Sequence, residues 1–457
     1  MTRDNGVRNQ NRFPQKAFEG MRRIVTVPAF LAALALSQLA WPQAKDMSND
    51  ERHQVDSMLF QVASDVSKHY YDPKLHGINW QAKVNEAREQ IRQEKSFNMA
   101  MAHVAAALDS LDDSHTFLIP PRRPYILDHG WTLEMVGDKC LVTHVRSGGD
   151  AETHGVKPGD QVLAINGYRV GRDNLWKIEF AFNALRPLPQ LTIALRDPQG
   201  ADRKVLLQAQ FRQRAHVQDL DPNTIMKMEL DGEQWAREQA IRTVGYGDKL
   251  LVAKLPSFML GDAEANEFMS RVESHEALIL DLRENPGGNI DALDRIVSSL
   301  FNHDVKMFDR VGRDSTKTVV ARSSRHPFQG KLFVLIDSKS ASASELLARI
   351  VQLEKRGVVI GDRSAGKVME SRVYSYSAGI DIVTFYGASI TDANLLMSDG
   401  ESLEHSGVTP DETVLETADD LANGRDPALA HAAELAGVKI TADQAGKLFP
   451  YEWPKEF

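Results

Sequence analysis

Cysteine is almost absent from this chain: its 457 residues include a single one, Cys140. One cysteine excludes an intramolecular disulfide and a cysteine-rich metal site, and predicts a small buried apolar side chain. An excess of positive charge is also lacking, since the formal net charge is −9. No basic tract interleaved with aromatic residues occurs, so nucleic acid is not an expected partner.

Low-complexity tracts and internal repeats are absent as well, and 42% hydrophobic with 26% charged residues is an ordinary globular composition. The chain is longer than one hydrophobic core usually supports. We therefore expect two or three domains.

The N-terminus has the layout of an export signal. Met21 and two arginines precede an apolar run over residues 24–41, which few polar residues interrupt. Residues 1–20 are polar and basic, which fits either a long leading region or a start at Met21. Residues 1–44 are thus predicted as an export signal or a membrane anchor. We expect an exported protein, periplasmic or extracellular, with anchoring to an inner membrane as the alternative.

Three further regions precede a C-terminal tail. Apolar residues at helical spacing predict a helical domain over residues 45–121. Short β-type runs separated by Gly and Asp turns follow over residues 122–215. Within them, residues 155–167 resemble the signature stretch of PDZ domains, which bind a chain end or strand at a sheet edge. Residues 130–133 lack the glycine pair familiar from peptide-binding members.

Residues 216–430 alternate strand and helix patterns, which predicts a layered α/β sheet with parallel neighbours. The expected elements are strands at 250–255, 277–282, 332–336 and 358–361 and helices at 263–274, 290–301 and 343–354. A helix is predicted at 427–436. It continues into the C-terminal tail, residues 431–457, which has an aromatic end. The predicted fold class is α/β multidomain: helical N-terminal domain, PDZ-like β domain and β/α layered peptidase core.

The turn after the strand at 332–336 and the first residues of the next helix contain three candidate serines: Ser340, Ser342 and Ser344. A strand, a tight turn and a helix start suit an exposed nucleophile, because small neighbours admit a carbonyl group and the following amide can face an oxyanion. The alternative is that these serines only cap the helix.

A lysine follows the next apolar strand, within the glycine-bounded loop at 361–367. Consecutive strand ends share one sheet edge, so Lys367 and a serine at 340–344 could meet there. Burial would lower the pKa of the lysine toward the operating pH of a base. A solvated surface lysine is the alternative. The loop also has phosphate-loop spacing, but Val368 replaces the Ser or Thr that this motif needs.

A strand at 278–282 runs into a Pro-Gly-Gly turn at 286–288 before another helix. Free backbone amides of this turn could supply a second oxyanion donor. The alternative is a plain turn and helix entry.

These three segments, in this order and after a PDZ-like module, resemble the carboxy-terminal processing, or tail-specific, peptidase family. The resemblance covers residues 55–429, including 113–116 and 404–411. It implies Ser342 as nucleophile, Lys367 as general base, and the amides of Ala343 and Gly288 as oxyanion hole. It also implies no metal or organic cofactor, and polypeptide substrates: exported proteins cut often near their C-termini.

Two departures from the family pattern concern the polar partner of the lysine. Leu353 and Ser371 stand where members often carry Asp or Gln, and the neighbouring acids Glu354 and Glu370 are candidate substitutes for that partner. The loop also reads Ser-Ala-Gly-Lys where Thr-Phe-Gly-Lys is common.

Two rival hypotheses remain. In the tricorn-like branch of the same superfamily a histidine is the base, and His115 after Ser114 matches that position. A rival of another class is a catalytically silent binding protein, in which both domains capture exported chains without cutting them. An intact Ser342 and Lys367 favour the enzyme.

Overall fold

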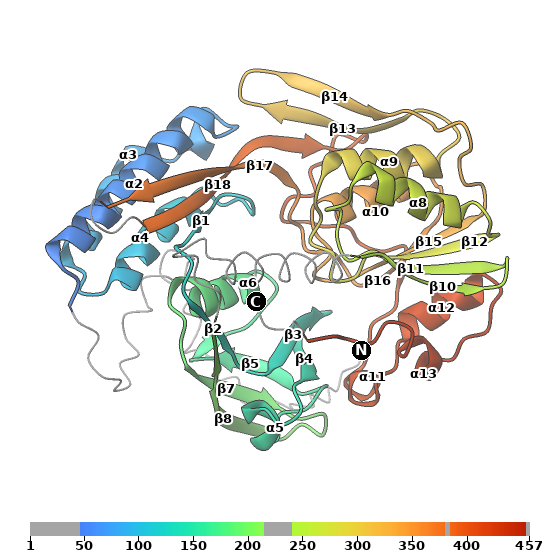
Figure 1. Cartoon of the computed structure of the whole chain (residues 1–457), viewed down its shortest axis with the longest axis horizontal. Helices are drawn as coiled ribbons and strands as arrows, with labels where there is room; N and C mark the ends of the chain where they lie inside the picture. Colours follow the sequence, from blue (N-terminus) through green and yellow to red (C-terminus); the bar gives the residue numbers. More distant parts are fainter. Residues whose placement is uncertain (1–45, 214–239, 380–383, 454–457) are drawn as a thin grey trace, which may run out of the picture.

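The computed structural model describes residues 46–213, 240–379 and 384–453. A helical layer, a small β module and a layered α/β core lie around the middle of the molecule (Figure 1). The predicted export segment, residues 1–44, lies outside the described residues. The domain boundaries proposed from the sequence stay predictions.

The core is a six-stranded sheet in the order β10, β11, β12, β15, β16, β19. All neighbours from β11 to β19 are parallel, and β10 pairs antiparallel with β11. The strands are β10 (Arg242–Tyr246), β11 (Leu250–Lys254), β12 (Ala277–Asp281), β15 (Lys331–Ile336), β16 (Val358–Gly361) and β19 (Glu412–Thr413). The apolar runs of β11, β12 and β15 are buried on both faces, and the predicted parallel sheet is confirmed.

Helices cover both faces of this sheet (Figure 1). One apolar cluster joins it to α8 (Asp262–Val272), α9 (Ile290–Leu300) and α10 (Ala343–Leu353). The opposite cluster contains α12 (Pro427–Leu435) and α13 (Ala442–Ala445). The predicted helices therefore exist within two residues of their expected ends, and part of the tail packs on the core.

A second, antiparallel sheet was not expected from the sequence. It consists of β1 (Phe117–Ile119), β13 (Val305–Gly312), β14 (Thr316–Ala321), β17 (Met369–Ala378) and β18 (Thr384–Leu396). Most residues of β17 are only half-buried or exposed. A ribbon with solvent on one side lacks the continuous apolar run of a core strand, so its pattern was easily missed.

The N-terminal helices pack against this ribbon (Figure 1). They are α2 (Asn49–His69), α3 (Trp80–Gln93) and α4 (Phe97–Asp109), with the short helix η2 (Leu75–Gly77) between the first two. The hydroxyls of Tyr376 and Tyr386 donate to Asp65 and Gln61 of α2 at 2.9 Å each. One apolar cluster runs through the helices, β18 and the small β module.

The small β module covers the described part of the predicted PDZ-like domain, residues 122–213, and is called the PDZ-like module below. It contains two sheets and three helices. Its elements are β2 (Tyr125–Asp128), β3 (Trp131–Val136), β4 (Lys139–Val145), α5 (Asp150–Thr153), β5 (Gln161–Ile165), β6 (Tyr168–Arg169), α6 (Leu175–Glu179), η3 (Phe180–Leu185), β7 (Gln190–Arg196), β8 (Asp202–Gln208) and β9 (Gln210–Gln213). Cys140 is buried in β4, as predicted. The carboxylate of Asp362 in the core pairs with Arg172 and accepts from the amide of Gly137 at 2.8 Å, so this module is docked on the core.

Candidate active site

Ser342 stands at the turn between β15 and α10 with a φ of 55°. A positive φ is unusual for a residue with a side chain and marks a backbone held by its surroundings. The Ser340 hydroxyl donates to the carbonyl of Leu282 at 2.8 Å, and that of Ser344 to the carbonyl of Asn285 at 3.0 Å. No described residue bonds the Ser342 hydroxyl. Of the three serines, Ser342 alone has a hydroxyl left for chemistry within the described residues.

The Pro-Gly-Gly turn lies directly over Ser342. A Cβ placed on Gly287 would come within 2.7 Å of the Ser342 Cβ, and one on Gly288 within 2.5 Å of the Phe258 carbonyl carbon. Their φ values of 97° and 145° also favour glycine. The buried side chain of Asn285 accepts from the Gly287 amide at 2.8 Å and donates to the carbonyl of Leu255 at 2.8 Å.

Two backbone amides are left over at this turn. Neither the N–H of Ala343, the first residue of α10, nor that of Gly288 donates to any described residue. A helix N-terminus carries partial positive charge, so Ala343 is a suitable donor to an anion. The two residues predicted for the oxyanion hole thus keep unpaired donors beside Ser342 within the described part of the chain.

The backbone joins the lysine loop to the serine turn, since the amide of Ser342 donates to the carbonyl of Lys367 at 2.9 Å. The side chains are not hydrogen-bonded to each other among the described contacts. Instead the Lys367 Nζ lies 4.7 Å from the ring centroid of Trp176 in α6. Burial lowers the pKa of Lys367, while Glu179, Glu345 and Glu404 raise it.

Glu345 ties the two loops together from the third position of α10. Its buried carboxylate accepts from the amides of Ser342, Gly366 and Lys367 at 3.1, 2.7 and 2.9 Å. It also accepts from the hydroxyl of Ser364 at 2.5 Å. Burial raises the pKa of Glu345 to about 7, although these four donors oppose the rise. This residue was not singled out from the sequence, although its place in the Ser-Ala-Ser-Glu segment matches a helix-capping signature.

A second carboxylate leads to His115. Glu404 accepts from the amides of Ser114 and Val368 at 2.7 and 2.8 Å, and from the Ser114 hydroxyl at 2.9 Å. That hydroxyl also lies 2.7 Å from the His115 Nδ1. When the Ser114 hydroxyl donates to Glu404, its oxygen can accept from a protonated Nδ1, and Nε2 of the neutral ring is then an acceptor.

His115 is neutral near pH 7 in this environment. Burial lowers the pKa of its imidazole to about 4, and the charge of Lys367 acts in the same direction against Asp113. The influence of Lys367 means that the two candidate bases are close enough to interact electrostatically. The sequence had marked His115 as the base of a rival hypothesis, and its geometry is compatible with that role.

Neither acid considered as a substitute polar partner reaches the lysine. Glu354 pairs with His303 at 3.1 Å, and Glu370 pairs with Arg310 at 2.9 Å. The carboxylates that act on Lys367 are those of Glu179, Glu345 and Glu404. Glu404 belongs to the segment 404–411 that the family resemblance includes, but the sequence assigned it no role. Nothing in the sequence pointed to Trp176.

The described residues contain no group of three or more His, Cys, Asp or Glu side chains arranged to hold a metal ion. Among the helices of residues 46–213, 240–379 and 384–453, none is long and apolar enough to cross a bilayer.

A serine at a strained strand-to-helix turn, with two amides that donate to no described residue and basic side chains nearby, is an arrangement typical of serine hydrolases on α/β folds. Comparison with known proteins makes the class specific. Residues 249–414 match peptidase family S41, and the resemblance inferred from the motifs is confirmed.

Named relatives agree with this family. The chain is 25% identical over 369 residues to the tail-specific protease of Haemophilus influenzae, covering 75% of this chain and 49% of that protein. It is 25% identical over 339 residues to carboxyl-terminal-processing peptidase 1, chloroplastic, of Arabidopsis thaliana, covering 69% and 63%. The chain thus spans about half to two thirds of the length of these relatives.

A solved structure, that of mature CPAF, shares the fold with a TM-score of 0.60 at 14% identity, covering 81% of this chain and 94% of that one.

Proposed function

We propose that this chain is a serine-type endopeptidase in which Ser342 is the nucleophile and Lys367 the general base. The observation that carries the proposal is the Ser342 hydroxyl, which no described residue bonds, at a strained turn. Above it lie Gly287 and Gly288, where a residue with a Cβ would clash with its neighbours. The peptidase S41 match and the protease names of the relatives support the reaction class.

In this mechanism the Ser342 Oγ attacks the carbonyl carbon of a peptide bond as its proton passes to neutral Lys367 Nζ. The amides of Ala343 and Gly288 donate to the oxyanion that forms. The lysine then protonates the leaving amine, and water hydrolyses the acyl-enzyme by the same route. Before the first step, Nζ must turn from Trp176 toward Ser342 by rotation about its side-chain bonds.

We further propose that the substrates are exported polypeptides, cut often near their C-termini. The names of the relatives and the apolar run at residues 24–41 support this substrate class. The same run supports a periplasmic or extracellular location, with anchoring to the inner membrane if the segment is retained.

Cleavage of casein tests the reaction and the nucleophile together. We expect the purified chain to cut casein, and the Ser342→Ala and Lys367→Ala variants to lose at least about 10³-fold in kcat/KM. Lys317→Ala is the matched control, because Lys317 is exposed on β14. Full activity of Ser342→Ala would refute the assignment.

A second candidate base is His115, as in the tricorn-like hypothesis. Its neutral imidazole and the Glu404–Ser114 chain behind it favour this alternative, and so does the contact of Lys367 with Trp176. The variants His115→Ala and Lys367→Ala separate the two bases, since only the true base is needed for turnover.

A catalytically silent binding protein remains the alternative of another class. The contact of Lys367 with Trp176 and the absence of a polar partner at Leu353 and Ser371 motivate it. A fluorophosphonate probe distinguishes the two classes, because it labels only an activated serine. Labelling of Ser342 in the unmodified chain would exclude the silent protein.

A further inference from the structure

The aromatic end of the chain crosses from the core to the PDZ-like module. Arg242 of β10 holds its beginning: the guanidinium lies 5.6 Å from the ring centroid of Phe449 and donates to the carbonyl of Pro450 at 3.4 Å. Residues 451–453 then reach the module, so five consecutive residues connect two parts of the molecule.

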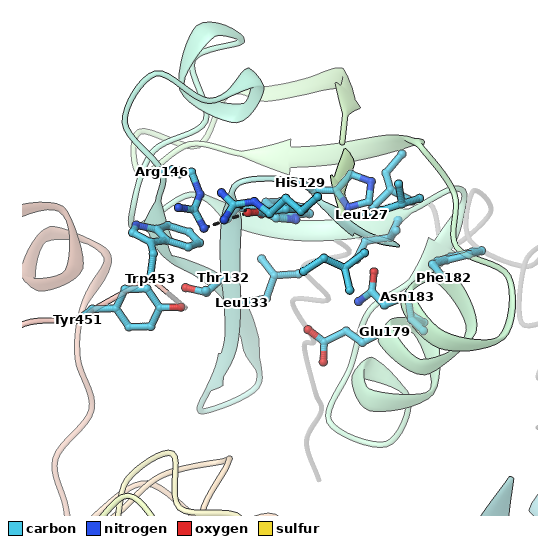
Figure 2. Close-up of a pocket in the computed structure, with 17 residues that line it drawn as sticks. Leu127, His129, Thr132, Leu133, Arg146, Glu179, Phe182, Asn183, Tyr451 and Trp453 are labelled. Atoms are coloured by element: carbon cyan, nitrogen blue, oxygen red, sulfur yellow. Dashed lines mark ion pairs between the residues drawn. The ribbon is translucent and has the colours of Figure 1, made fainter. Parts of the chain in front are cut away.

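Two aromatic rings make the contact on the PDZ-like module. Tyr451 stacks on His144 with ring centroids 3.9 Å apart and an interplanar angle of 19°. The guanidinium of Arg146 lies 4.2 Å from the ring centroid of Trp453. Glu452 between them is exposed, so the alternate residues of this segment face the module. Figure 2 shows both rings beside Thr132 and Arg146.

These rings form one wall of a cavity of about 350 Å³ in the module. The opposite wall comes from Glu179 and Phe182 of α6 and η3 (Figure 2). Further apolar lining residues are Leu133, Ile165, Ile178 and Leu191. The cavity therefore lies between the tail and α6, the helix whose Trp176 contacts Lys367.

The contact has the properties of a reversible interface rather than of a core. Tyr451 and Trp453 are only half-buried, and their partners are a histidine and an arginine instead of aliphatic side chains. Stacking and cation–π contacts at partly exposed positions are individually weak. A segment held in this way can leave without unfolding the module.

We propose that residues 449–453 are an intramolecular ligand of the PDZ-like module, which they fasten to the core in the position where Trp176 lies on Lys367. The occupant of the His144–Arg146 surface is thus this chain's own tail, bound in cis. In this position the tail regulates the active site, and this part of the proposal rests on the proposed function. Release of the tail frees α6, and with it Lys367, to move.

Hydrogen exchange and proteolysis on the full chain test the proposal. The Tyr451→Ala/Trp453→Ala double variant removes both rings, and His144→Ala removes the receiving ring without changing the tail. Phe60→Ala is the control, because Phe60 is 71% exposed on α2. For both test variants we expect faster exchange of amides in residues 172–186 and about fivefold faster cleavage of casein. The control should match the unmodified chain.

Unchanged exchange in residues 172–186 in both test variants would overturn the proposal. Exchange in the unmodified chain that depends on protein concentration would also overturn it, because the tail would then occupy a second copy. A third outcome is faster exchange in the test variants with no casein cleavage by any form, the unmodified chain included. It would support the binding of residues 449–453 to the PDZ-like module and contradict the proposed peptidase function.

Discussion

The two halves of the candidate site, around Ser342 and around Lys367, are built in different ways. Ser342 is held within the core, where Asn285 and Glu345 bond the neighbouring backbone and Gly287 lies directly above. The side chain of Lys367 instead contacts Trp176, which belongs to the PDZ-like module. The core therefore fixes the proposed nucleophile by itself, whereas the side chain of the proposed base contacts a separate module.

Replacement of Gly287 should cause the largest effect, since it damages the half that the core holds fixed. In Gly287→Ala the new Cβ would lie 2.7 Å from the Ser342 Cβ and 2.9 Å from the Ala343 amide. We expect kcat to fall by about 10²–10³-fold, as for loss of an oxyanion donor. Gly200→Ala is the control, because its φ of 93° is similar but nothing lies within 4 Å. Equal losses would mean that backbone strain, not the contact, is responsible.

Glu345→Gln should weaken the connection between the halves. An amide NH₂ would face the N–H donors that the carboxylate now satisfies, so we expect activity to fall about 10²-fold and unfolding to cost about 2 kcal/mol less. Glu354→Gln, which alters a surface pair with His303, should cost under about 1 kcal/mol. Steady-state kinetics and urea unfolding measure both effects.

The stability of the unmodified chain should also depend on Glu345. Its pKa is raised in the folded state to about 7 from 4.5, so the native state binds more protons between these values. The contribution of this carboxyl to stability is present below about pH 4.5 and is lost as the pH rises to about 7, by about 3 kcal/mol. Urea unfolding of Glu345→Gln should lack this decrease; an identical pH profile would contradict the prediction.

The pH dependence of kcat/KM distinguishes Lys367 from His115 as the general base. A base must be deprotonated, so catalysis by Lys367 gives a kcat/KM that rises at alkaline pH through a pKa below 10.5. Catalysis by His115, with its pKa near 4, gives a profile already level above about pH 5. Casein cleavage from pH 4 to 10 distinguishes them. We expect the alkaline rise.

The smallest effect should come from Trp176, because one cation–π contact is worth about 1 kcal/mol. In Trp176→Ala the Lys367 side chain loses its partner on the PDZ-like module, and labelling of Ser342 by a fluorophosphonate should quicken about fivefold. Trp176→Phe keeps a weaker ring and should lie between the two. Slower labelling of Trp176→Ala would mean that the ring supports catalysis.

The sequence predicted the parts of this structure whose signals are local. Continuous apolar runs marked β12 and β15, and the turns that follow them placed Ser342 and Gly288 at one sheet edge. β17 is mostly half-buried or exposed, and β18 mixes apolar residues with Gly, Ser, Thr and Asp, so neither has such a run and both were missed. Contacts between distant segments, such as Trp176 on Lys367 and Glu404 on Ser114, depend on tertiary packing that no local pattern records.

The loop that bears Lys367 begins at an anchor on the other module. Asp362 pairs with Arg172 and accepts from Gly137, and five residues later the same loop ends at the lysine, a span of at most about 17 Å of chain. Lys367 is in turn tied to the serine turn, because the amide of Ser342 donates to its carbonyl. The loop therefore links the docking contact of the PDZ-like module to Ser342 through one short stretch of backbone.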